Sequence, residues 1–235
     1  MSQESKKYSQ EIRSLIYFII FLTIIFGYND KSDVLSINLW LTNLVLVLAI
    51  VALISLVYVL GIKLTSKKYG NKAYFKLTDN PKSLKSYIRH ILALALTLVS
   101  NGLIFFTPLY NIEFKKVRQL NNIYERDREY DQALAFFSGN FFILILLLIF
   151  SYFNITLGSM MCVWFIAWNL VPLASQSGTQ TFFISRPLYV FSLVFFPLSI
   201  MLSISFAPLL SLILALIFAI ALFIFYYYMA EYKSY

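Results

Sequence analysis

The chain has 235 residues, of which 60% are hydrophobic and only 13% charged, and its mean hydropathy is +0.75. Soluble domains carry about 25% charged residues, so this composition excludes an ordinary cytosolic globular domain and a disordered chain. The net charge is +8. Because Cys162 is the single cysteine, a disulfide within the chain is excluded. Because His90 is also the single histidine, a zinc site of the usual kind would rely almost wholly on carboxylates.

Long apolar runs predict the fold class. About 20 apolar residues in a helix span the hydrocarbon core of a bilayer. The first run follows a dozen polar residues and lacks a small-residue cleavage pattern, so we expect a retained helix rather than a cleaved signal peptide. Asn154 with Gly158, and later Pro208, divide two runs that are too long for one crossing. The sequence predicts an all-α polytopic membrane protein, one integral membrane domain over 1–235, with six transmembrane helices at about 14–28, 37–62, 134–153, 158–175, 187–206 and 208–230.

The segment at about 88–110 is apolar but is interrupted by Ser100-Asn101-Gly102 and by Pro108. If it crossed the membrane, eight of the nineteen basic residues would lie outside; if it entered and returned on one side, eighteen would be cytoplasmic and only Lys31 external. The positive-inside rule favours the second arrangement. We therefore expect a re-entrant or interfacial segment, cytoplasmic loops at 63–87 and 111–133, and both termini on the cytoplasmic side of a plasma or cell membrane.

Two charged segments flank this apolar segment. Lys63–Arg89 contains eight basic residues, and Glu113–Asp131 contains five basic and five acidic residues. A nucleic-acid site is one interpretation of the first, but a loop facing anionic lipid is favoured, because each Lys or Arg near such a surface contributes about 1 kcal/mol. The second is typical of a solvated amphipathic loop or helix. We expect the lipid bilayer, and no nucleic acid, as a partner.

Catalytic chemistry inside the membrane has few candidate residues. Ionisable groups in membrane helices are costly and usually functional, but all eleven Asp and Glu residues lie outside the apolar runs. This argues against a proton relay, an ion-coupled transporter and a voltage sensor. Ser177-Gly178 could mimic a nucleophile turn with His90 as its base, although an interfacial polar role is favoured for His90. Cys162 is expected to be a small buried hydrophobe.

Several short blocks follow one another in a recognisable order and spacing. They are Gln10-Glu11-Ile12-Arg13-Ser14-Leu15, Val57-Tyr58-Val59-Leu60-Gly61-Ile62-Lys63-Leu64, Lys67-Lys68-Tyr69-Gly70, Ala73-Tyr74-Phe75, Ala135-Phe136-Phe137-Ser138-Gly139-Asn140, Trp164-Phe165-Ile166-Ala167-Trp168-Asn169-Leu170-Val171-Pro172 and Arg186-Pro187-Leu188. Together they resemble the site-2 protease family of intramembrane zinc metalloproteases, in a compact archaeal-like form. The resemblance implies six crossings, a strand at Ala73–Phe75, a zinc cofactor and cleavage of peptide bonds.

The residues that carry the family's chemistry are replaced. Aligned on Lys63, Tyr58 stands in place of the first metal-binding His, Val59 in place of the general-base Glu, and Ile62 in place of the second His. Ser177 stands where the metal-binding Asp is expected. Zinc, the family's cofactor, therefore lacks its ligands, and we expect no catalytic residue, no metal and no other cofactor, with these four positions vestigial.

Four further residues belong to retained stretches of the resemblance: Asn140, Asn169, Pro172 and Gly178. The two Asn side chains could hold helices together by a hydrogen bond, which is favoured, or could recognise the backbone of an extended substrate segment. Three functions stay open: an inactive site-2-protease-like protein that binds transmembrane segments or partner proteins, an active peptidase with atypical residues such as Ser177, and a structural subunit of a membrane complex.

Overall fold

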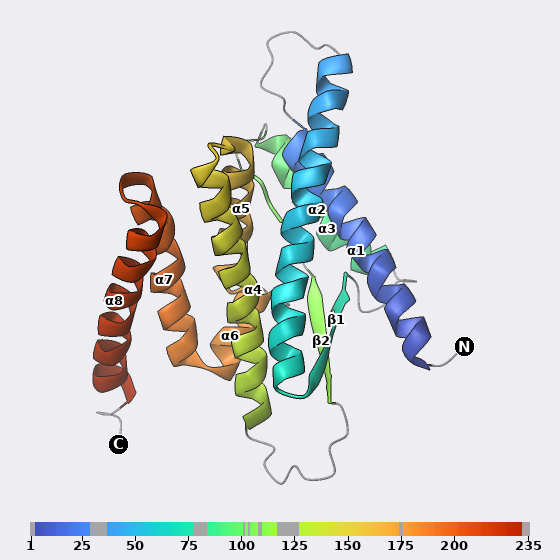
Figure 1. Ribbon diagram of the computed structural model, residues 1–235. Helices are drawn as coiled ribbons and strands as arrows, with labels where there is room; N and C mark the ends of the chain where they lie inside the picture. Colours follow the sequence, from blue (N-terminus) through green and yellow to red (C-terminus); the bar gives the residue numbers. More distant parts are fainter. Residues whose placement is uncertain are drawn as a thin grey trace. The chain divides into compact units, whose positions relative to one another are not determined.

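The computed structural model describes residues 3–28, 37–77, 84–100, 102, 104–107, 110–116, 127–173 and 176–231. It divides into two compact units, Met1–Arg118 (unit 1) and Gln119–Tyr235 (unit 2), and each is described here by itself. The elements in chain order (Figure 1) are α1 (Gln3–Gly27), α2 (Ile37–Lys68), β1 (Asn71–Lys76), α3 (Leu84–Val99), β2 (Asn111–Lys116), α4 (Asp127–Tyr152), α5 (Thr156–Leu170), α6 (Ser177–Ile184), α7 (Arg186–Ser205), α8 (Pro208–Tyr226) and the π-helical turn η1 (Tyr227–Glu231).

Five helices within the described ranges are long and apolar enough to cross a membrane. They are Lys7–Gly27 in α1, all of α2, Glu129–Tyr152 in α4, Arg186–Ile204 in α7, and Pro208–Met229, which includes α8. An integral membrane protein built from apolar helices agrees with the sequence analysis. The remaining expected crossing corresponds to α5, which has 15 residues and is shorter than the roughly 20 that a straight crossing needs. The six-crossing count therefore stays a prediction.

Helix boundaries differ from the apolar runs mainly where polar residues continue a helix. α1 begins at Gln3 rather than near residue 14, and α4 begins at Asp127 rather than near 134, because Lys, Glu, Gln and Arg are good helix formers. α5 ends at Leu170, short of residue 175, and the short helix α6 follows it. The breaks at Asn154, which has a positive φ of 58°, and at Pro208, the first residue of α8, agree with the sequence prediction.

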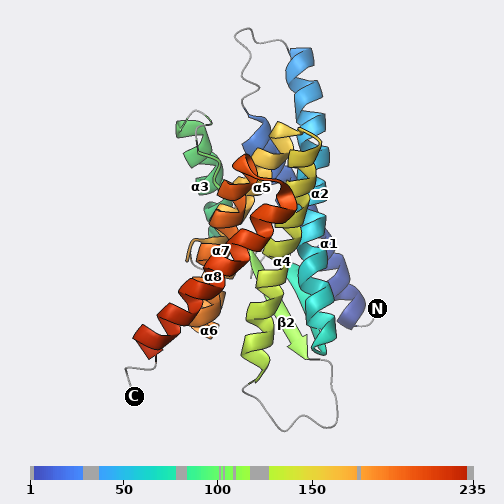
Figure 2. The same ribbon diagram turned by 60° about the vertical axis from the view of Figure 1, so that its left-hand side comes forward.

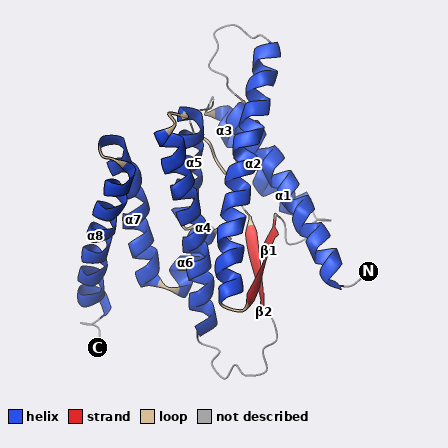
Figure 3. Ribbon diagram, in the orientation of Figure 1, coloured by secondary structure: helices blue, strands red, loops and turns tan. Residues whose placement is uncertain are grey.

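Two short strands lie within the segments expected as cytoplasmic loops, 63–87 and 111–133, and the rest of the regular structure in the described residues is helical, as the all-α prediction expects. β1 and β2 pair antiparallel in a two-stranded sheet, shown in red in Figure 3, with Asn71 opposite Lys116 and Lys76 opposite Asn111. β1 coincides with the strand that the family resemblance implies at Ala73–Phe75. Gly70, with φ of 71°, makes the tight turn between α2 and β1. The alternation of apolar and polar residues that marks a strand is hard to recognise over six residues. Both β1 and β2 mix Lys with aromatic residues.

The segment between the strands leaves the sheet and returns to the same end of it, because Lys76 and Asn111 are paired. α3 ends at Val99, and the turn at 100–102 closes with a hydrogen bond from Gly102 N to the Thr97 carbonyl (3.0 Å). The chain then runs back to β2, as Figures 1 and 2 show. This returning path is the one that the re-entrant prediction requires, and its depth in a membrane stays a prediction.

Glu11 joins three elements of unit 1. Its side chain is only 6% exposed, and its Oε1 accepts a hydrogen bond from the Phe75 backbone N–H (3.2 Å) and lies 2.7 Å from the Lys63 ammonium. A strand edge presents backbone donors that need partners. The Glu11 carboxylate supplies one for β1, and Lys63, at the C-terminal part of α2, balances its charge. One carboxylate therefore fixes α1 and α2 against the sheet.

We predict that Glu11→Ala lowers the free energy of unfolding by about 1–3 kcal/mol, because the Phe75 N–H loses its acceptor and Lys63 its counter-ion. Glu11→Gln keeps an acceptor oxygen and should cost less. The measurement is unfolding of the detergent-solubilised chain, with Glu129→Ala on the exposed start of α4 as the control. Equal effects of Glu11→Ala and Glu129→Ala would contradict the assignment.

Candidate functional site

Tyr58, which the sequence resemblance aligns with a metal-binding His, lies in a buried aromatic cluster of Phe18, Tyr58, Phe75 and Tyr110. The Tyr110 hydroxyl donates to the Tyr58 hydroxyl (2.6 Å), and both side chains are 1% exposed. The Tyr110 ring stacks on Phe75, with centroids 5.3 Å apart, and meets Phe18 edge-on at 5.4 Å. Buried hydroxyls need hydrogen-bond partners, and these two supply each other. The cluster fills the surroundings of Tyr58 with rings.

The α2 positions that the resemblance aligns with the family's metal ligands and base do not fit a zinc ion. Tyr58 and Ile62 are four residues apart, so they share one helix face, and Ile62 is as buried as Tyr58. Val59 is half-buried. Neither Val59 nor Ile62 has a lone pair for a metal, and the Tyr58 oxygen is engaged by Tyr110. Among the residues that the structure describes, no three His, Cys, Asp or Glu side chains gather where they could hold a metal ion.

Asn140 and Asn169 form the interhelical hydrogen bond that the sequence analysis favours. Asn169 Nδ2 donates to Asn140 Oδ1 over 2.9 Å, and the residues are 1% and 4% exposed. The contact joins α5 to α4 within unit 2. A polar pair in an apolar helix interface is costly unless its hydrogen bonds are made, so this bond determines which faces of α4 and α5 contact each other. Recognition of a substrate backbone by the same amides stays a prediction.

The end of α5 is tied to α6 and α7 through its last carbonyls, which lack partners within the helix. The Ser177 hydroxyl donates to the Asn169 carbonyl (3.1 Å), and the Tyr189 hydroxyl donates to the Leu170 carbonyl (3.1 Å). Gly178 lets the start of α6 approach this end, since a Cβ there would lie 2.6 Å from the Leu170 oxygen. Pro172 is exposed and follows the end of α5.

The proposed serine nucleophile is therefore part of a helix junction. Ser177 is 1% exposed, and its hydroxyl proton points to a backbone carbonyl, which cannot act as a general base. His90, its expected partner, belongs to unit 1, whereas Ser177 belongs to unit 2. His90 is buried within the protein (1% exposed) next to the Phe21 ring at 5.8 Å, and its position at the membrane interface stays a prediction. Cys162 is fully buried, as expected.

Gln176 precedes Ser177 and carries a polar group that the fold does not satisfy. It is fully buried, and neither its Oε1 nor its Nε2 has a hydrogen-bond partner among the described residues. Its backbone is used: Gln176 N donates to the Leu173 carbonyl (3.1 Å), and its own carbonyl accepts from Gln180 N (3.2 Å). An amide can donate and accept at once, so it matches the N–H and C=O groups of a peptide backbone.

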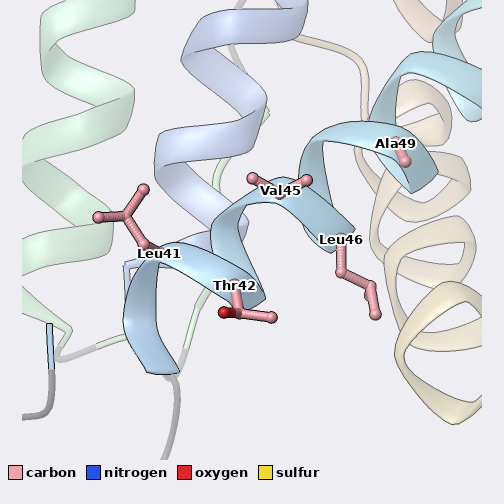
Figure 4. A pocket seen from close by; sticks show the side chains of 5 residues that line it. All are labelled: Leu41, Thr42, Val45, Leu46 and Ala49. Carbon is pink, nitrogen blue, oxygen red and sulfur yellow. The ribbon is translucent and has the colours of Figure 1, made fainter. Parts of the chain in front are cut away.

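An open apolar depression of about 550 Å³ lies along the N-terminal half of α2. It is lined by Leu41, Thr42, Val45, Leu46 and Ala49 (Figure 4). The Thr42 hydroxyl, its one polar group, donates to the Asn38 carbonyl of its own helix (2.8 Å). Such a surface suits the hydrocarbon of a bilayer and offers no chemistry.

Comparison of the chain with protein-family models, curated proteins and solved structures finds no match. The resemblance to site-2 proteases rests on the sequence blocks alone, and what it implies for function stays a proposal.

Four residues of these sites have weak signals in the sequence. Glu11 lies just before the first apolar run, and only the extension of α1 buries it. Tyr110 and Phe75 are separated from Tyr58 by long stretches of chain, so periodicity cannot pair them. Gln176 stands among polar residues, where its burial has no local signature. Each is a consequence of tertiary packing.

We predict that Gly178→Ala destabilises unit 2 by about 1–3 kcal/mol, because the new methyl group meets the backbone oxygens of Asn169 and Leu170, which cannot rotate away. Gly27→Ala in α1 is the matched control, since its nearest atoms lie at 3.8 Å, an ordinary contact. Thermal unfolding in detergent measures both variants. A loss of stability in Gly27→Ala as large as that in Gly178→Ala would contradict the close-approach argument.

Proposed function

We propose that the chain is a catalytically inactive site-2-protease-like membrane protein that binds transmembrane segments or partner proteins. The observation that carries this proposal is the Tyr58–Tyr110 hydrogen bond inside the aromatic cluster, at the helix position where the family resemblance expects a metal-binding His. Tyr58 and Ile62 are packing residues of unit 1, and Val59 has no group that takes up a proton.

Hydrolysis of a peptide bond by this family's chemistry needs an ion that activates water and a base that accepts its proton. Side chains at the vestigial positions supply neither. Conversion to packing residues keeps the helices while removing the reaction, and a protein so altered acts through what it binds. We propose six crossings with both termini cytoplasmic, in the plasma or cell membrane, as the charge distribution of the sequence favours.

Support for a binding role comes from the unsatisfied amide of Gln176. Buried polar groups almost always have partners, so a buried amide that has none among the described residues invites a ligand. A membrane-spanning segment that is locally unwound exposes N–H and C=O groups, which have no partner in lipid. Gln176 can pair with one of each. Binding at Gln176 thus satisfies the amide and the exposed backbone groups of the bound segment. The site therefore selects a membrane helix with a break over a regular helix.

We expect the purified chain to contain no stoichiometric zinc and to leave a model single-span membrane substrate uncut. Ser177→Ala should then behave as the unaltered chain does in the cleavage assay. Ser192→Ala is the matched control, because Ser192 is also buried and donates to a backbone carbonyl, that of Leu188 (2.7 Å).

Stoichiometric zinc that a chelator removes, together with peptide-bond cleavage, would overturn the proposal. Cleavage that Ser177→Ala abolishes and Ser192→Ala preserves would establish instead an active peptidase that uses Ser177. Elemental analysis and mass spectrometry of the products distinguish these results.

We predict that Gln176→Leu leaves the free energy of unfolding unchanged or raises it by about 1 kcal/mol, because it removes an unpaired buried amide. The same variant should bind a single-span peptide with a central Gly-Pro break at least several-fold more weakly. Fluorescence titration in micelles measures the affinity. Gln132→Leu is the control, because Gln132 is a half-buried glutamine on α4. Equal binding by Gln176→Leu and the unaltered chain would remove the amide from the proposed site.

A further inference from the structure

Arg186 is the only charged side chain in the long apolar part of unit 2. From Gln132 to Ala230 the sequence contains no Lys, His, Asp or Glu, so this stretch carries a single ionised group. Arg186 is exposed, and it is the first residue both of α7 and of the apolar span Arg186–Ile204. A charge is costly in an apolar span unless it has a partner or reaches the membrane surface. The guanidinium therefore lies at the end of a span, where a group of opposite charge can approach it.

The described residues give Arg186 an aromatic neighbour and no carboxylate. Its guanidinium carbon lies 6.0 Å from the centre of the Phe182 ring, at the outer limit of a cation–π contact. No ion pair among the described residues includes Arg186. Arginine presents five donors in a fixed fork that matches a carboxylate, and stacking on a ring occupies none of them. The fork of Arg186 is therefore without an acidic partner in the part of the chain that the structure describes.

Aromatic rings lie beside Arg186 where α6 ends and α7 begins (Figure 1). The Phe182 ring meets the rings of Phe183 and Tyr189 edge-on, with centroids 5.5 and 5.3 Å apart. Phe183 is 79% exposed, so it presents an apolar surface one ring away from the charge. Protein interfaces are enriched in Arg and aromatic residues. The α6–α7 corner, formed by Phe182, Phe183, Arg186 and Tyr189, therefore has the composition of a binding surface.

The α6–α7 corner lies one short helix away from Gln176. α6 has eight residues and is therefore about 12 Å long, and Gln176 precedes its first residue while Arg186 follows its C-cap, Ser185. Roughly four residues of extended backbone, or about eight residues of helix, cover that distance. A segment that pairs its backbone with Gln176 thus brings a side chain about four to eight residues away to Arg186.

We propose that Arg186 pairs with a carboxylate of the membrane segment that binds at Gln176, an Asp or Glu about four to eight residues from the break in that segment. This inference rests on the proposed function, and it adds the charge of the partner. The lone positive charge selects a negative group, and the nearness of Gln176 selects a side chain of the bound segment over a lipid phosphate. Because Arg186 begins a span, the carboxylate lies near the membrane surface, where its desolvation costs less than at the centre.

The test measures binding of single-span peptides to the full chain in micelles of a neutral detergent, by fluorescence titration. Each peptide has a central Gly-Pro break and carries Glu, Gln or Lys about six residues from it. Arg186→Gln removes the charge, Arg186→Lys keeps the charge without the fork, and Arg186→Glu reverses it. Arg13→Gln is the matched control, because Arg13 is an exposed arginine of unit 1. Thermal unfolding verifies that every variant is folded.

We expect the unaltered chain to bind the Glu peptide roughly fivefold more tightly than the Gln peptide, and the Lys peptide more weakly than either. The exposure of Arg186 limits this gain, because ion pairs open to water contribute little. Arg186→Gln should bind the Glu and Gln peptides equally, and Arg186→Lys should keep part of the preference. Arg186→Glu should prefer the Lys peptide. Arg13→Gln should behave as the unaltered chain does.

Equal binding of the Glu, Gln and Lys peptides by the unaltered chain would overturn this inference and leave the proposed function standing. Failure of all three peptides to bind would overturn the proposed function as well. A preference for Glu that Arg13→Gln also loses would show a diffuse attraction to the basic chain.

A further arm adds phosphatidylglycerol to the micelles, with native mass spectrometry of the retained lipid. Phosphatidylglycerol that the unaltered chain retains and Arg186→Gln releases, together with loss of the Glu preference, would assign the guanidinium to a lipid phosphate and overturn the inference. We expect the Glu preference to persist in this lipid.

Discussion

Backbone groups that lose their regular partners must find others, and in a chain this apolar few side chains can supply them. A helix end or a strand edge that lies away from water needs an acceptor or donor from elsewhere. Glu11 meets this need at β1, and Ser177 and Tyr189 meet it at the end of α5. Ser, Thr, Tyr and Glu oxygens thus decide where the elements of each unit stop and which neighbours they contact.

The same constraint explains the turn after α3. Thr97 donates its hydroxyl to the Ala93 carbonyl and accepts from the Phe106 backbone N–H (3.4 Å), while the Ser100 hydroxyl accepts from Ile104 N (3.2 Å). These bonds give the backbone N–H groups of Ile104 and Phe106, in the non-helical stretch, partners from the protein itself. Irregular backbone at membrane depth is tolerated only under such conditions. Among the described residues, the bonds of Thr97 and Ser100 are of the kind that a re-entrant path needs, and the path itself stays a prediction.

The apolar runs of the sequence determine where most helices lie. The breaks at Asn154 and Pro208 can be recognised because Asn tolerates a positive φ and Pro favours the first turn of a helix. The strands are harder to predict. β1 and β2 are six residues each and stand in a basic segment, so hydropathy describes them as loops. Glu11, Tyr110 and Gln176 depend on residues far away in the chain, and local pattern carries no information on such pairs. The Asn140–Asn169 bond could be anticipated, because two buried amides in apolar helices have few other partners.

The rings around Tyr58 determine what α2 requires of its surroundings. A metal site needs open access for water and substrate, and rings that touch one another need the opposite. Tyr58, Phe75, Phe18 and Tyr110 contact one another edge-on or stacked at centroid separations of 5.2 to 5.7 Å. The cluster thus gives unit 1 a rigid centre, and any recognition by this chain must take place away from it.

The position of Glu11 has a consequence for synthesis of the protein. Its acceptor contact spans 64 residues, to Phe75, and Lys63 is made only shortly before that. At about 5–20 residues per second, roughly 3–13 seconds pass between translation of Glu11 and translation of Phe75. Until Lys63 is translated the carboxylate of the first helix lacks its counter-ion, and until Phe75 is translated it lacks its backbone donor. The helix therefore reaches its final place only after α2 and β1 have been made, and the order of the chain sets the order in which unit 1 assembles.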